Sequence, residues 1–330
     1  MLTREFVQAL PKAELHLHLE GAVPWAMVRA QAADLPSQPP WWADGFRFTD
    51  FTEFRGAVLT CMGCLVDAPA YGAAAGAIFR DLVAQNVRYV EISFDIVRVL
   101  DKGLAVAEVA AAVKAAVPPG LSARVFAAFS QHKPERTPPA VARTVLEAPA
   151  LDGVSLHGDE TVQSIPHFID VFAEARRRGL ATKAHAGELM GPASVVQALD
   201  LLGVRRIEHG VRAMEDPALV ERLAAEAITL DVCPWSNVRL RVIRGLAEHP
   251  MRRLHQRGVR MTVNTDDPTV FGRTLGQELA SVVDDLAFSM ADVARLQANA
   301  FAVAGMPAAA RDSVIAEIDA LVREIEPGKA

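Results

Sequence analysis

The stretch PKAELHLHLEG, residues 11–21, indicates both the fold and the chemistry of this chain. Polar and apolar residues alternate from Ala13 to His18, which is the period of a β-strand. His16 and His18 are two residues apart, so both side chains point to the same face of that strand. Two imidazoles in one buried space repel each other when protonated and waste hydrogen bonds when neutral, unless a cation lies between them. The pair by itself is a weak motif, and a purely structural role explains it equally well.

Further short apolar runs follow along the chain, each separated from the next by a helical stretch, and this alternation is typical of parallel βαβ units. The predicted strands are Ala13–His18, Val87–Phe94, Ala123–Phe129, Gly153–His157, Ala181–His185, Val204–His209, Ala227–Val232 and Val259–Asn264. Eight strands close a barrel, whereas an open doubly wound sheet usually has about five or six. We therefore expect a single α/β domain over residues 1–330, folded as a TIM (β/α)8 barrel.

Helices are predicted between the strands and at two additional places. The runs with helical composition are 105–117, 165–178, 193–202 and 217–225, with extra helices at 51–65 and 70–85 after the first strand and over 277–325 at the C-terminus. An insertion after a barrel strand lies on the catalytic face. We interpret residues 36–85, which begin with a cluster of Pro and Trp, as a lid or pocket wall; an irregular packing loop is an equal alternative.

Composition and charge limit the class of protein. Hydrophobic residues make up 51% and charged residues 22%, the formal net charge is −6, and no long Lys/Arg block favours a nucleic-acid partner. The N-terminus has no apolar signal-peptide core, and the most apolar stretch, residues 105–117, is too short to span a bilayer. Three cysteines fit a reducing compartment better than a disulfide framework. We expect a cytoplasmic protein without a membrane or nucleic-acid partner, and the oligomeric state stays open.

Ionisable residues gather at the ends of the predicted strands, where barrel enzymes keep their active sites. They are His16, His18, His157, His185 and His209, with Asp266 and Asp267 directly after the last strand. Three imidazoles and one carboxylate, from His16, His18, His185 and Asp266, are a natural ligand set for catalytic zinc, whose bound water has a pKa of about 7. Iron(II), cobalt and manganese accept related ligands, so the sequence does not fix the metal.

Three more motifs add candidate catalytic groups. Glu188 follows His185 in HAGE, where shielding beside a metal pocket raises a carboxyl pKa enough for proton donation; a solvated glutamate near a helix N-terminus is the alternative. His209 in IEHG is placed to orient the attacking water, although core histidines bonded to a backbone carbonyl are commoner. Asp266 and Asp267 in NTDDP need a positive group or a donor between them.

Together with GDE at 158–160 and VCPWSN at 232–237, these motifs make the sequence similar to the adenosine deaminase family, in the family's order and over nearly the whole chain. The resemblance implies one zinc ion per chain, held by His16, His18, His185 and Asp266. It also implies that Glu188 protonates purine N1, and that His209 and Asp266 manage the proton of the attacking water. Asp267 would accept a hydrogen bond from the N7 side, the backbone N–H of Gly158 would reach N3, and His18 would also border the substrate.

The resemblance is imperfect at Glu20, where adenosine-specific members usually carry the Asp that binds the ribose hydroxyl. We expect deamination of adenosine and deoxyadenosine to inosine and deoxyinosine, because GDE and VCPWSN resemble the adenosine branch. The alternative is adenine or a modified adenine, such as an N6-substituted adenine or aminodeoxyfutalosine, because deaminases of these compounds share HLHLEG. His157 either reshapes the N3 edge of the pocket or points into the barrel wall.

Two other functions stay open. A barrel amidohydrolase with two metals bridged by a carboxylated Lys183 is the nearest enzyme, but Glu188 has no clear role in that scheme. An inactive purine-binding relative is the other, and the intact set of metal and catalytic residues disfavours it. The remaining Cys and His residues have no motif that marks a site, and we predict core or surface roles for Cys61, Cys64, His132, His167, His249 and His255.

Overall fold

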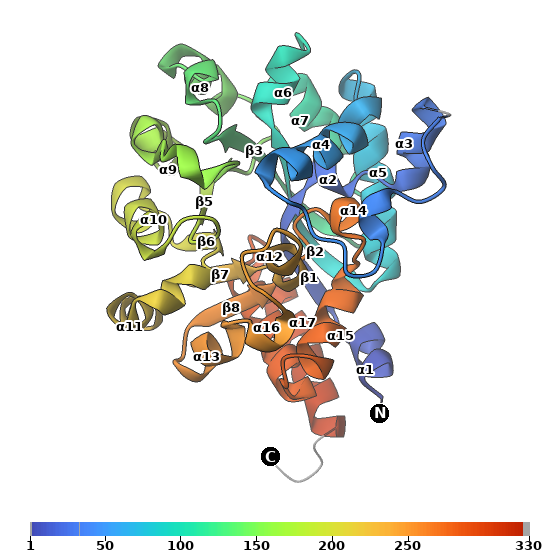
Figure 1. Ribbon diagram of the computed structural model, residues 1–330, viewed down its shortest axis with the longest axis vertical. Coiled ribbons are helices and arrows are strands. Elements are labelled where there is room, and N and C mark those ends of the chain that lie inside the picture. Colours follow the sequence, from blue (N-terminus) through green and yellow to red (C-terminus); the bar gives the residue numbers. More distant parts are fainter. Residues whose placement is uncertain (1, 33, 326–330) are drawn as a thin grey trace.

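The centre of the computed structural model, which describes residues 2–32 and 34–325, is one sheet of eight parallel strands in chain order (Figure 1). The strands are β1 (Lys12–His18), β2 (Val87–Asp95), β3 (Ser122–Ser130), β4 (Gly153–His157), β5 (Ala181–Ala186), β6 (Arg206–His209), β7 (Thr229–Val232) and β8 (Arg260–Val263). Every predicted strand is present, and none of their ends differs from the prediction by more than two residues. The predicted TIM barrel is confirmed.

The barrel closes between β1 and Asp266, which is the third residue after the end of β8. Leu17 forms an isolated parallel bridge with Asp266. The backbone N–H of His18 donates to the carbonyl of Asp266, and the N–H of Asp266 donates to the carbonyl of His16, both at 3.0 Å. The closure of the sheet therefore fixes the first and last candidate metal ligands relative to each other.

Helices surround the strands (Figure 1). The α-helices are α1 (Thr3–Ala9), α2 (Leu19–Ala22), α3 (Trp25–Gln31), α4 (Phe51–Cys61), α5 (Ala68–Ala84), α6 (Ile96–Asp101), α7 (Val106–Ala115), α8 (Pro139–Leu146), α9 (Ile169–Arg177), α10 (Pro192–Gln197), α11 (Pro217–Ala225), α12 (Pro234–Arg239), α13 (Met251–Gln256), α14 (Pro268–Phe271), α15 (Leu275–Asp284), α16 (Met290–Val303) and α17 (Ala308–Ile325). Two predicted helices are less regular than expected: 165–178 begins with a 3-10 turn, Ile165–Phe168, and 193–202 ends in a π-helical turn, Ala198–Leu202. The extra helices after β1 and at the C-terminus are confirmed.

The barrel interior holds charged residues in ion pairs. Lys183 of β5 is 1% exposed, lies 3.0 Å from Glu208 of β6 and donates to the carbonyl of Leu15 at 2.6 Å. Arg206 of β6 bridges Glu91 of β2, at 2.7 Å, and Asp231 of β7, at 2.5 Å. Because a buried charge without a partner is strongly destabilising, these pairs hold the strands in register beneath the catalytic face.

The segment after β1 packs against the barrel as a wall. The indole N–H groups of Trp41 and Trp42 both donate to the carbonyl of Thr269 in α14, and the rings of Phe54 and Phe271 stack 5.6 Å apart. Helix α4 in this segment lines a cavity at the carboxyl ends of the strands. Residues 36–85 therefore contribute a wall of the pocket and are not only an irregular packing loop. Whether they move as a lid stays a prediction.

Across residues 2–32 and 34–325, no individual helix has the length and apolar character of a membrane span. Only the segments 51–64 and 68–84 reach that threshold together, and they are bent by 107° relative to each other.

Candidate active site

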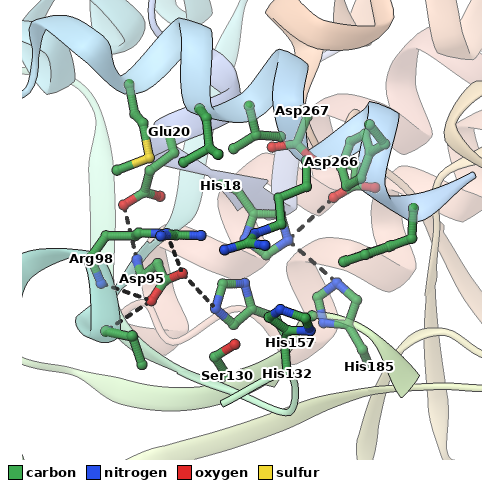
Figure 2. A pocket seen from close by; sticks show the side chains of 18 of the residues that line it. His18, Glu20, Asp95, Arg98, Ser130, His132, His157, His185, Asp266 and Asp267 are labelled. Atoms are coloured by element: carbon green, nitrogen blue, oxygen red, sulfur yellow. Dashed lines mark hydrogen bonds and ion pairs between the residues drawn. The ribbon is translucent and has the colours of Figure 1, made fainter. Parts of the chain in front are cut away.

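A cavity of about 880 Å³, counted with the open solvent at its mouth, lies where the strands end. Its lining includes His18, His185, His209 and Asp266, which form its inner end, and side chains of α4, α6 and the loop after β3, which form its outer walls. Figure 2 shows His18 between Asp266 and His185. The side chains that the sequence motifs predicted to meet therefore do so at one end of the barrel.

Four buried ligand atoms converge at this inner end. The Nε2 atom of His18 lies 3.2 Å from Nε2 of His16 and 3.3 Å from Nε2 of His185. The Oδ1 atom of Asp266 lies 3.3 Å from Nε2 of His16 and 3.2 Å from Nε2 of His18. All four atoms lie within 4.8 Å of one another. The structure thus brings together the four residues that the sequence assigned to the metal.

The other ring nitrogen of each histidine has its own acceptor. Nδ1 of His16 faces the carbonyl oxygen of Asp231 at 3.4 Å, and Nδ1 of His185 faces that of Leu156 at 3.0 Å. Nδ1 of His18 lies 2.9 Å from Oγ of Ser93, whose hydroxyl donates to the carbonyl of Leu17. These acceptors favour a proton on every Nδ1 and leave the lone pairs of the three Nε2 atoms pointing at one another.

Three converging lone pairs beside a carboxylate oxygen are stable only around a cation. Nitrogen and oxygen donors from three histidines and one aspartate fit zinc, and the chain's residues therefore fit the metal that the motifs imply. Lys183 is already ion-paired with Glu208 and hydrogen-bonded to a carbonyl, so its amine is not free to form a carboxylated bridge. The geometry favours one metal over a bridged pair.

Asp266 and His209 are held in strained backbone conformations. Their φ angles are +63° and +68°, in the left-handed region that residues with side chains rarely occupy. Such strain costs about 1–3 kcal/mol per residue and is common at active sites. Burial opposes ionisation of Asp266, but His16 and the other imidazoles outweigh it and hold the pKa of this carboxyl well below its usual range.

Glu188 lies at the inner end with its carboxyl 3.4 Å from Nε2 of His209. Burial, together with the charge of Asp266, raises the pKa of Glu188 well above its usual range, so the side chain carries a proton that it can donate. Its loop is fixed by Glu160 of the GDE motif, whose Oε2 accepts the backbone N–H of Glu188 at 3.2 Å and of Met190 at 2.7 Å. Glu160 is thus a positioning residue.

A chain of buried hydrogen bonds sets the proton on His209. The backbone N–H of Met251 donates to Nδ1 of His249, so Nε2 of His249 carries the proton that faces Oδ1 of Asn237 at 3.2 Å. The amide nitrogen of Asn237 then lies 3.3 Å from Nδ1 of His209 and donates to it. Nδ1 of His209 is therefore an acceptor, and its Nε2–H points into the cavity, 3.8 Å from Oδ2 of Asp266.

Asp267 and Gly158 border the same cavity. Burial and the charge of Asp266 raise the pKa of Asp267 well above its usual range, which favours the protonated carboxyl. The predicted contact of Asp267 with the N7 side of the ring stays a prediction. Gly21 makes room for the side chain, because a Cβ atom at Gly21 would lie 1.7 Å from Oδ1 of Asp267. Gly158 has a φ of +92°, a conformation that requires glycine.

Glu20 and His157 lie on the side of the cavity away from Asp266 (Figure 2). Oε1 of Glu20 accepts the backbone N–H of Asp95 at 2.9 Å, and burial together with Asp95 raises the pKa of Glu20 to about 7. His157 stacks on His18 with 5.4 Å between ring centroids and lies 3.7 Å from Oδ2 of Asp95. His157 therefore lines the pocket instead of the barrel wall.

Sequence reasoning assigned His132 and His249 to the surface or core, and it missed Asp95, Asn237 and Ser236. His132 is half-buried and lines the cavity. His249 is buried and reaches the site through Asn237. The hydroxyl of Ser236 donates to Oδ2 of Asp266 at 2.8 Å. The motif VCPWSN held the signal for Ser236 and Asn237, but no pattern marked His249 or Asp95.

Known proteins resemble this chain over nearly its full length. The family model described as adenosine deaminase matches residues 11–321. The adenine deaminase of Rhodospirillum rubrum is 36% identical over 308 residues, covering 89% of this chain and 92% of that protein. The adenine deaminase of Arthrobacter aurescens has a TM-score of 0.88 at 30% identity, covering 95% and 99% of the two chains. An amidohydrolase from Burkholderia ambifaria, solved with bound zinc, has a TM-score of 0.85 at 26% identity, covering 98% and 94%.

Proposed function

Because the chain belongs to the adenosine deaminase family, we propose that it is a zinc-dependent aminohydrolase that deaminates the adenine ring, with free adenine a better substrate than adenosine. The relatives reported above that have a named activity are adenine deaminases. Glu20 supports the same choice. Its side chain is one methylene longer than the aspartate that usually binds the ribose hydroxyl, so its carboxylate reaches into the space that the sugar would occupy. Adenosine, the substrate that the sequence first suggested, becomes the second candidate.

The observation that carries the proposal is the convergence of four metal-ligand atoms and two buried carboxyls, Glu188 and Asp267, on one cavity, where burial raises the pKa of both carboxyls. His16, His18, His185 and Asp266 would hold one zinc ion, as their converging lone pairs require. When bound, zinc lowers the pKa of water to about 7 and so supplies hydroxide at neutral pH.

Glu188 and Asp267 recognise and activate the ring. With C6 facing the ligand cluster, Glu188 donates its proton to N1, which makes C6 more electrophilic. Asp267, when protonated, donates to N7. The N7 atom is an acceptor because N9 of the adenine ring bears the hydrogen or the substituent. The backbone N–H of Gly158 is assigned to N3. Water adds to C6, the bond between C6 and the exocyclic nitrogen breaks, and the products are hypoxanthine and ammonia.

Asp266 and His209 have different roles toward the attacking water: Asp266 accepts its proton, and His209 donates a hydrogen bond to its oxygen. His209 stays neutral, since burial and the neighbouring His16 lower its pKa well below the usual range, and its Nε2–H donates toward the attacking oxygen. Because Nδ1 of His209 already accepts from Asn237, the resting imidazole has no free lone pair for a proton. Asp266, ionised and only 3.8 Å away, is therefore the acceptor of the water proton.

The test is ammonia release by the zinc-loaded protein from adenine, adenosine, deoxyadenosine, N6-methyladenine and aminodeoxyfutalosine, with metal analysis of the same sample. We expect about one zinc per chain, since a single set of three histidines and one aspartate forms one catalytic site. We expect adenine to give a higher kcat/KM than adenosine. Two metal equivalents with a modified Lys183, or no ammonia from any purine, would contradict the proposed function.

A further inference from the structure

Glu208 is a buried carboxylate that takes no part in the proton transfers assigned to Glu188, Asp266 and His209. It stands on β6, directly before His209 in the IEHG motif, and is fully buried. Neither of its carboxylate oxygens has a hydrogen-bond partner in the described part of the chain. A buried carboxylate without hydrogen bonds is costly unless positive charge lies close to it. The groups around Glu208 therefore indicate what it does.

Glu208 faces two of the four candidate metal ligands. Its Oε2 lies 3.2 Å from Nδ1 of His185, and its Oε1 lies 3.9 Å from Nε2 of His16. The Nδ1–H of His185 already donates to the carbonyl of Leu156 at 3.0 Å, so Glu208 places a second, charged acceptor beside the same proton. Because Glu208 is not among the residues that line the cavity, it approaches the metal ligands from behind.

Two cations hold the carboxylates of this network, but they do not use up the negative charge. Nζ of Lys183 lies 3.0 Å from Oε1 of Glu208 and 3.6 Å from Oε2 of Glu91. Arg206 pairs with Glu91 at 2.7 Å and with Asp231 at 2.5 Å. Three carboxylates thus share two cations. The remaining negative charge favours a cation held by the ligands that Glu208 faces.

We propose that Glu208 strengthens metal binding by holding the Nδ1–H of His185 and by adding negative charge behind the four ligands. A carboxylate beside the second nitrogen of a metal-binding histidine fixes the ring and makes the ligand nitrogen more basic. Glu208 is in this role a positioning residue, because it contacts a ligand and not the substrate. The proposal rests on the metal site of the proposed function but not on the choice of substrate.

The competing explanation is that Glu208 only neutralises Lys183. Glu91 provides the matched control, since it is fully buried like Glu208 and faces the same lysine. Over residues 2–32 and 34–325, Glu91 forms no ion pair with a histidine within 4.0 Å, whereas Glu208 does. If neutralising Lys183 were the whole role, removing either charge would affect metal binding in the same way.

The experiment measures zinc affinity without any substrate, by competition between the metal-free protein and a chromophoric chelator. Glu208→Gln keeps the size of the side chain and loses its charge, so we expect the Kd for zinc to rise by about 10–100-fold. Glu91→Gln should leave this Kd nearly unchanged. Both variants should lower the Tm of the metal-free protein, because each removes a partner from a buried cation.

A second measurement follows the proton on His185 directly. In zinc-loaded protein labelled with ¹⁵N-histidine, we expect the Nδ1–H signal of His185 to move upfield in Glu208→Gln, as its hydrogen bonding weakens, and to stay in place in Glu91→Gln. If Glu208→Gln does not fold, Glu208→Asp keeps a charge for Lys183 but withdraws it from His185 by one methylene. Zinc binding by Glu208→Asp should then be several-fold weaker than in the wild type.

The outcomes separate this proposal from the proposed function. Zinc binding by Glu208→Gln as tight as in the wild type, or an equal loss of affinity in Glu91→Gln, would overturn the role of Glu208. If ammonia is still released from an aminopurine in that case, the deaminase assignment stands. If Glu208→Gln binds zinc weakly as expected but the wild type releases ammonia from no aminopurine, the proposed function fails and the role of Glu208 at the metal site stands.

Discussion

The inner and outer ends of the cavity are built in different ways. At the inner end the reactive groups stand on or directly after β1, β5, β6 and β8, and the second nitrogen of each candidate zinc-binding histidine has a partner of its own. At the outer end the side chains come from α4, α6 and a loop, and Arg55 and Lys133 have no acidic partner in the described part of the chain. The difference indicates that the sheet fixes the chemistry, while the walls can change the substrate without disturbing it.

The largest expected effect tests the chemistry at the inner end. Glu188→Gln keeps the shape of the side chain but loses the acidic proton, so we expect kcat to fall by about 10³-fold, within the range for general acid catalysis. Zinc content should be unchanged, because Glu188 is not among the four converging ligands. His185→Ala is the matched comparison and should lose zinc and activity together. Near-normal turnover by Glu188→Gln would rule out its role at N1.

A smaller effect tests whether the inner end depends on its supporting hydrogen bonds. Asn237→Asp has nearly the same shape, but its ionised carboxylate can only accept, so it would draw the proton of His209 from Nε2 to Nδ1. We expect kcat to fall on the order of 10²-fold with little change in KM, because the wrong tautomer faces the reacting oxygen.

The control for this prediction is His249, the next residue in the hydrogen-bond chain after Asn237. His249→Gln keeps an N–H donor for Asn237 and should retain most of the activity, whereas His249→Leu should resemble Asn237→Asp. Equal kcat values for Asn237→Asp and the wild type, measured with zinc-saturated protein across pH 6–9, would show that the tautomer of His209 does not matter.

The smallest effect tests the outer end. Glu20→Asp shortens the side chain by one methylene and should move the carboxylate toward the position suited to a ribose hydroxyl. We expect kcat/KM for adenosine relative to adenine to rise by about tenfold, the equivalent of about 1.4 kcal/mol in the transition state. A side-by-side assay of both proteins on both purines measures the ratio. An unchanged or lower ratio would remove Glu20 from the determinants of substrate choice.

The fold was predictable because its signals are local. The alternation in β1 and the apolar runs of the other strands predicted every strand end to within two residues of its position in the structure. The irregular turns inside 165–178 and 193–202 were not predictable, since their composition is helical and only packing distorts them. His16, His18, His185 and Asp266 were identified because their motifs end strands, and parallel strands bring their ends to one face.

By itself, the sequence determined the barrel, the candidate metal ligands and the adenosine deaminase family, because strand period, residue spacing and motif order can all be read without knowledge of contacts. Only the tertiary structure decided which nitrogen of His209 faces Asn237, that burial raises the pKa of Asp267, and that His132 and Asp95 line the cavity. Those properties depend on burial and on neighbours distant in the chain, such as the pairing of His249 with Asn237 and of Asp95 with Glu20. A protonation state or a pocket wall is set by the groups that surround it in space, which no local stretch of sequence contains.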